Sequence, residues 1–128
     1  MSEKLSGVIV AHTELAEALL AAVRAIAGDE TGLVAVSNRG TDLKALVRRI
    51  DAAVGGAGRP ALLFTDMPGG SCAHTAAALA RGREDVRVVT GVNLAMLLDF
   101  VFHRELPLEA AAERAVQTGR SSVGIVPR

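Results

Sequence analysis

The sequence predicts one α/β domain with a doubly wound, mainly parallel four-stranded sheet and helices on both faces. Two observations lead to this fold class. Short apolar runs rich in β-branched residues alternate with longer stretches whose apolar residues recur at helical spacing. The expected strands are also apolar on both faces, as parallel strands are when helices cover the two sides of a sheet. The length of 128 residues fits one domain, expected to span residues 1–128.

Strands are expected at residues 5–11, 32–37, 61–65 and 86–90. Helices are expected to begin after N-capping side chains, whose oxygens can accept a backbone N–H of the first turn. The candidate N-caps are Thr13, Thr41 or Asp42, Ser71 and Asn93, and Pro107 suits the first turn of a last helix. Glycines are expected to end several helices, at Gly28, Gly55, Gly82 and Gly119, while the fourth helix runs to about Arg104. A final apolar segment, residues 122–126, could form a fifth strand.

Composition removes several classes of function. Lys+Arg and Asp+Glu number 14 each, so no basic field attracts nucleic acid, and an aromatic content of 2% removes stacking platforms for single strands. One cysteine, Cys72, forms no internal disulfide. No apolar run approaches the ~20 residues that span a bilayer, and the first apolar run is too short for a signal peptide. A cytoplasmic protein is therefore expected.

Two side chains at strand ends carry the expected chemistry. His12 follows the first strand and precedes the first helix, and Asp66 follows the third strand. Ligands of doubly wound sheets collect beyond the carboxyl ends of the strands. If the first and third strands are neighbours, the Asp66 carboxylate can accept the proton of one His12 ring nitrogen and leave the other as a nucleophile.

A glycine-rich turn adds an anion site. Gly69, Gly70 and Ser71 lie between the third strand and its helix, where backbone N–H groups and a hydroxyl could hold a phosphoryl group, with Thr13 beside His12. A metal site is less attractive because His74 and His103 are expected on separate helices, and no cofactor is expected. Such residues also occur as simple turns and caps, so they alone predict only an anion-binding domain.

Four ordered motifs resemble the mannose-type IIA domain of the phosphoenolpyruvate-dependent sugar phosphotransferase system, also called the mannose/fructose/sorbose family. They are residues 7–12 (GVIVAH), 65–71 (TDMPGGS), 91–97 (GVNLAML) and 115–120 (AVQTGR). The resemblance implies a phosphotransferase that accepts a phosphoryl group from the phosphocarrier HPr on His12 and donates it to a IIB protein. It also implies that Asp66 orients His12 and that Gly69, Gly70 and Ser71 border the phosphoryl group. A homodimer that exchanges its last strand, residues 122–126, is implied as well, and so is a protein that is peripheral at most to a membrane permease.

The chain departs from the family pattern at the rim of this site. Family members often carry an aromatic residue at the position of Pro68, a proline at Cys72 and an asparagine near His74. Three alternatives stay open: a regulatory phosphocarrier without sugar transport, the phosphotransferase subunit of dihydroxyacetone kinase, and a non-catalytic nucleotide or flavin binding module. The last is disfavoured because no Gly-x-Gly-x-x-Gly fingerprint follows the first strand and few aromatics could sandwich a flavin.

Overall fold

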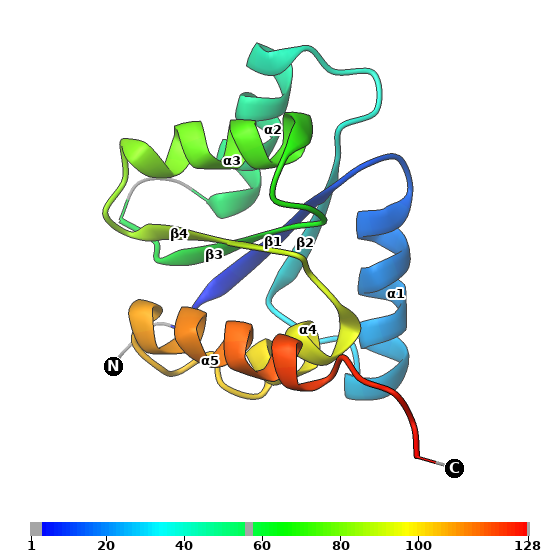
Figure 1. Cartoon of the computed structure of the whole chain (residues 1–128). Helices are drawn as coiled ribbons and strands as arrows, with labels where there is room; N and C mark the ends of the chain where they lie inside the picture. The colour runs from blue at the N-terminus through cyan, green and yellow to red at the C-terminus, as the bar shows by residue number, and fades with distance from the viewer. Residues whose placement is uncertain (1–3, 56–57, 128) are drawn as a thin grey trace.

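The computed structural model describes residues 4–55 and 58–127, and within them the strands and helices alternate as predicted (Figure 1). The strands are β1 (Ser6–Ala11), β2 (Leu33–Ser37), β3 (Ala61–Thr65) and β4 (Val86–Thr90). The helices are α1 (Leu15–Ala27), α2 (Leu43–Val54), α3 (Gly70–Arg81), α4 (Leu94–Val101) and α5 (Leu108–Ser121). No helix among the described residues is long and apolar enough to cross a membrane.

The strands form one parallel sheet in the order β2-β1-β3-β4. The chain first adds β2 on one side of β1 and then returns to add β3 on the other side. The winding therefore reverses between β1 and β3, which are direct neighbours with Val10 opposite Thr65. Loops diverge at such a reversal and open a crevice beyond the carboxyl ends of the two strands. The prediction of a doubly wound parallel sheet is confirmed.

Helices cover both faces of the sheet, with α2 and α3 on one face and α1, α4 and α5 on the other (Figure 1). Successive strand residues point to opposite faces. In β1, Val8 and Val10 join the core under α2 and α3, whereas Ile9 joins the core under the other helices. Phe64 and Phe100 meet edge to face there, with ring centroids 5.3 Å apart. Burial on both faces explains why the central strands β1 and β3 are largely apolar, whereas the outer strand β4 carries Arg87.

Two helix N-caps are confirmed and two are wrong. The side chains of Asp42 and Asn93 accept hydrogen bonds from the amides of Ala45 and Met96. Thr13 is not a cap, because it lies one residue too early and adopts a φ of 51° in the loop before α1. The third helix begins two residues earlier than expected, at Gly70.

At α3 the N-cap position belongs to Gly69, and Ser71 lies inside the first turn. Two boundaries near the C-terminus also differ from the expectation. The fourth helix ends at Val101 rather than about Arg104, and α5 continues through Gly119 to Ser121. Gly119 is a close-packing residue: a Cβ there would lie 2.6 Å from the Cε atom of Met96. A glycine chosen for packing gives the same sequence signal as one that ends a helix.

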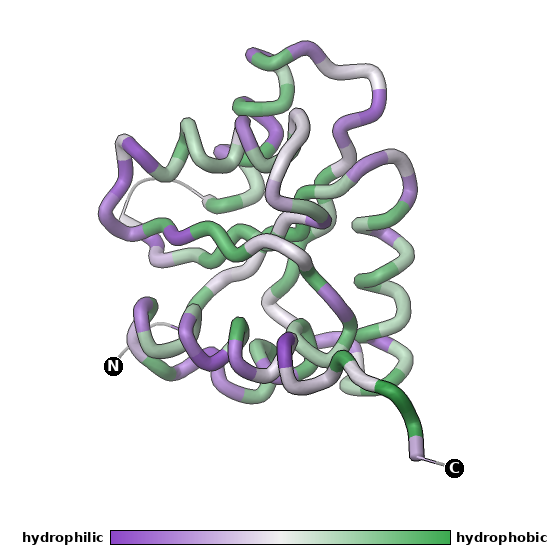
Figure 2. Tube along the Cα trace, in the orientation of Figure 1, coloured by the Kyte–Doolittle hydropathy of each residue, from purple (hydrophilic) through white to green (hydrophobic). Residues whose placement is uncertain are grey.

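Residues 122–127 form no strand within this chain. They leave α5 as an exposed tail whose apolar side chains Val123, Ile125 and Val126 are 76%, 97% and 84% exposed. The tail projects away from the body of the domain (Figure 2). The expected fifth strand is therefore not formed within the single chain, where the tail pairs with neither outer strand of the sheet.

Candidate active site

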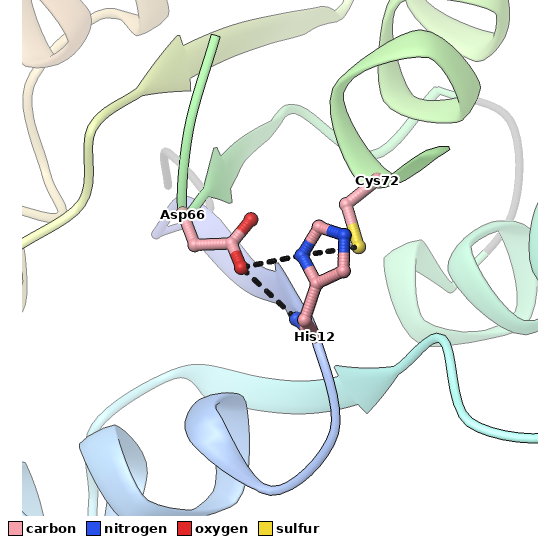
Figure 3. A group of neighbouring side chains, drawn as sticks. All are labelled: His12, Asp66 and Cys72. Carbon is pink, nitrogen blue, oxygen red and sulfur yellow. Dashed lines mark hydrogen bonds and ion pairs between the residues drawn. The ribbon is translucent and has the colours of Figure 1, made fainter. Parts of the chain in front are cut away.

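His12 and Asp66 meet at the reversal between β1 and β3, as the sequence predicted. The Nδ1 atom of His12 lies 2.7 Å from Oδ2 of Asp66, and the His12 backbone N–H donates to the same oxygen at 3.0 Å (Figure 3). Two hydrogen bonds from one residue to one carboxylate oxygen fix both the backbone and the ring. The ionised carboxylate can only accept, so Nδ1 carries the proton of this hydrogen bond. The lone pair of neutral His12 therefore lies on Nε2.

Asp66 is held ionised at this position. Burial acts to raise the pKa of its carboxyl, but the hydrogen bonds from the His12 amide and ring and the charge of His12 outweigh burial and lower the pKa below its ordinary value. Its other oxygen, Oδ1, is buried and has no hydrogen-bond partner in the described part of the chain. All of its hydrogen bonding to His12 thus passes through Oδ2. The carboxylate can stabilise positive charge that develops on the ring.

The free nitrogen of His12 faces the start of α3. A Cβ built on Gly70 would lie 3.6 Å from both Cε1 and Nε2 of His12, so the helix begins in direct reach of this edge of the ring. Gly70 has a φ of +89°, which favours glycine. The first amides of a helix have no partner within it and attract anions. An anion bound to Nε2 would therefore meet the positive end of α3.

The other predicted phosphoryl-binding residues border the same place. Ser71 is exposed in the first turn of α3, Gly69 precedes that helix, and Thr13 directly follows His12. The sequence interpretation missed Asn38, which follows β2. Its side chain accepts from the Thr13 amide at 3.1 Å and donates to Ser71 Oγ at 3.3 Å. The rule that found His12, polar residues directly after a strand, would have found Asn38 at the end of β2 as well.

Cys72 lies beside the pair, fully buried, with Sγ 3.9 Å from His12 Nδ1. Burial, followed by the charge of Asp66, raises the pKa of this thiol, although a hydrogen bond with Ser71 opposes the shift. Ligand atoms of His12, Asp66 and Cys72 lie within 4.8 Å of one another. However, the 2.7 Å between Nδ1 and Oδ2 is a hydrogen-bond distance, shorter than the about 3.4 Å between ligand atoms of a tetrahedral zinc site. The arrangement is an oriented histidine with a protonated thiol beside it.

The other two histidines make no hydrogen bond to this pair among the described residues. His74 is exposed on α3. His103 follows α4, and its Nδ1 lies 2.7 Å from the carbonyl oxygen of Asp99, one of the carbonyls at the end of that helix. His12 is thus the histidine whose ring faces a helix N-terminus at the sheet's switch point.

Solved structures show the same fold. The mannose/sorbose specific IIA subunit of the phosphotransferase system from Enterococcus faecalis superposes with a TM-score of 0.88 at 23% identity, covering 98% of this chain and 97% of that one. The phosphotransferase system component EIIA from Streptococcus agalactiae gives 0.87 at 21% identity, with 94% and 96% covered. The PTS IIA protein associated with the fucose utilization operon from Streptococcus pneumoniae gives 0.78 at 18%, with 98% and 96% covered.

No curated protein matches the sequence. A family model does: the model of the PTS system fructose IIA component, EIIA-man, matches residues 6–117. The match includes every strand and all residues of the site described above. The chain therefore belongs to the EIIA-man family, as a IIA-type phosphotransfer component of the sugar phosphotransferase system.

Proposed function

We propose that the chain carries a phosphoryl group on Nε2 of His12, which it accepts from phosphorylated HPr and passes to a separate IIB protein. The observation that supports this most is the 2.7 Å contact between Nδ1 and Asp66, because it leaves Nε2 with the lone pair and aims it at α3. The His12 side chain is 39% exposed, which suits a group that two partner proteins must reach in turn.

In the proposed step, the Nε2 lone pair attacks the phosphorus of the donor. The bond from phosphorus to the donor breaks as the bond to Nε2 forms, and the Nδ1 proton stays in its hydrogen bond to Asp66. The ring becomes positively charged, and the ionised carboxylate stabilises it. Amides at the start of α3 face the phosphoryl oxygens. Passage to the IIB protein reverses these events, with an acceptor nucleophile attacking the phosphorus of phosphorylated His12.

The acceptor assignment is tested by replacing histidines one at a time. Incubation with phosphoenolpyruvate, enzyme I and HPr should add one acid-labile phosphoryl group to the wild-type chain, read by intact mass. His12→Ala should abolish it, whereas His74→Ala and His103→Ala should leave it unchanged, because among the described residues neither ring hydrogen-bonds to Asp66 as His12 does. Label that survives His12→Ala and disappears in His74→Ala would contradict the proposal.

We also propose that the chain is a homodimer in which the exposed tail, residues 122–127, pairs with the partner. The tail carries three largely exposed apolar side chains, and β4 is an outer strand with β3 on one side only. An unpaired strand edge is a template for another strand. Light scattering should report a dimer for the full chain and a monomer after deletion of residues 122–128. An equally stable dimer after the deletion would contradict strand exchange.

A further inference from the structure

We infer that Asn38 is a positioning residue for phosphoryl transfer: it fixes the Ser71 hydroxyl as a hydrogen-bond donor toward a phosphoryl group on His12. This inference rests on the proposed function of His12. Asn38 lies half-buried directly after β2, at the same end of the sheet as His12. Its amide joins the loop that follows β1 to the first turn of α3, the two segments that flank the His12 ring.

The orientation of the Asn38 amide follows from its partners. The backbone N–H of Thr13 can only donate, so the Asn38 atom 3.1 Å from it must be the oxygen. The amide nitrogen then faces Ser71 Oγ at 3.3 Å, and an amide nitrogen can only donate. Ser71 Oγ is therefore the acceptor of this hydrogen bond. Its own proton is left to point elsewhere.

A phosphoryl group on Nε2 is the strongest acceptor that this proton could meet. Ser71 directly follows Gly70, whose Cβ position lies 3.6 Å from Nε2. The nearby Cys72 thiol is only a weak acceptor, and burial keeps it protonated. A hydroxyl that donates to a phosphoryl oxygen makes a charge-assisted hydrogen bond. Asn38 thus directs the Ser71 hydroxyl proton. That proton finds its acceptor when a phosphoryl group is bound to Nε2 of His12.

The same amide also supports the loop that carries His12. Thr13 has a φ of 51°, a left-handed conformation that non-glycine residues rarely adopt. Its amide is held by Asn38 Oδ1, and its carbonyl oxygen accepts from Ser37 Oγ at 2.6 Å. A useful variant must therefore keep the acceptor for Thr13 and remove only the donor for Ser71. Asn38→Asp does this, because its second oxygen would accept the Ser71 proton instead.

The matched control is Asn93→Asp. The Asn93 amide makes an equivalent pair of bonds, accepting from the Met96 amide at 2.9 Å and donating to the Gly119 carbonyl at 3.1 Å. Asn93→Asp therefore removes one amide donor and adds one negative charge, and it leaves the hydrogen bonds of Ser71 and Thr13 unchanged. Thermal unfolding of both variants measures any loss of fold stability, which can then be compared with the change in transfer rate.

The experiment measures single-turnover transfer from phosphorylated HPr for wild type, Asn38→Asp, Asn93→Asp, Ser71→Ala and the double variant of residues 38 and 71, at ~0.5 M salt to screen the added charge. Asn38→Asp and Ser71→Ala should each lower the maximal rate about 10- to 100-fold, the value of a hydrogen bond to a charged group. The donor concentration for half-maximal rate should not change. The double variant should be little slower than Ser71→Ala, because both changes remove one donor.

Three results would overturn the inference. Transfer by Asn38→Asp could match transfer by Asn93→Asp, the effects of the two single substitutions could multiply in the double variant, or the loss could follow thermal stability alone. A wild-type chain that takes no phosphoryl group on His12 would instead overturn the proposed function itself, and the inference with it. The wild-type reaction run in the same series distinguishes the two failures.

Discussion

Replacing Asp66 with asparagine tests whether charge or shape makes His12 reactive. The carboxylate receives both hydrogen bonds from His12 on a single oxygen, Oδ2, while Oδ1 has no partner among the described residues. Because the His12 backbone N–H can only donate, it should hold the amide oxygen of the substituted side chain at the position that Oδ2 occupies in the wild type. The ring tautomer is then kept. The substitution removes the negative charge and leaves the geometry.

The expected loss follows from that charge. A full positive charge on the ring about 4 Å from a carboxylate is stabilised by roughly 4 kcal/mol at an effective dielectric constant near 20. With half of that charge developed in the transition state, the loss is about 2 kcal/mol, and weakening of the charge-assisted hydrogen bond adds about 1 kcal/mol. Asp66→Asn should therefore slow transfer roughly 10²-fold, and Asp66→Ala, which also frees the ring, up to about 10⁴-fold.

Rapid-quench measurement of transfer from phosphorylated HPr provides the rates, and a melting curve of each variant shows whether the fold survives. We expect both variants to fold, since Asp66 lies at the end of β3 and not among the buried core residues. An Asp66→Asn variant that transfers within about threefold of the wild-type rate would refute the electrostatic argument. Asp66 would then only shape the turn before α3.

Two further predictions concern stability. Because the pKa of Asp66 lies below its ordinary 3.8, ionised Asp66 stabilises the fold above that pH, and this contribution is lost as the pH falls through the folded-state pKa. The difference in unfolding free energy between wild type and Asp66→Asn should thus be larger at pH 7 than at pH 3 in urea titrations, and an equal difference would contradict the assigned pKa. Gly7→Ala should destabilise the fold by about 1–3 kcal/mol, because its Cβ would lie 2.7 Å from Leu33 Cδ2 and 2.8 Å from Phe100 Cε2. Gly124→Ala is the control, because open space surrounds that position. Equal urea midpoints for the two variants would refute the packing argument.

Local patterns were sufficient to predict the sheet and the contact between His12 and Asp66. Apolar runs located β1 to β4 within one residue, because strands buried on both faces leave few other interpretations. His12 and Asp66 followed from one topological rule, that side chains directly after neighbouring parallel strands meet at one edge. Asn38 obeys the same rule at the end of β2, and its contacts with Thr13 and Ser71 come from residues distant in sequence.

The errors arose where one residue type serves several purposes. Gly119 resembles a helix terminator, yet it lies inside α5. A side chain at this position would clash with Met96. Thr13 and Ser71 resemble N-caps, but their polar atoms contact the loop after β2. Residues 122–126 were expected as a strand, but within the single chain they pair with no other strand. Long-range contacts decide each case, and local propensity does not contain them.

In the proposed function, Asp66 binds the protonated Nδ1 of His12 and leaves Nε2 free to bond phosphorus. The most direct test of this is ¹⁵N and ³¹P NMR of the chain labelled with ¹⁵N-histidine and phosphorylated through HPr, in which the coupling identifies the nitrogen bonded to phosphorus. We expect phosphorylation of His12 at Nε2, with Nδ1 still protonated and hydrogen-bonded to Asp66. Phosphorus bonded to Nδ1, or to His74 or His103, would contradict it.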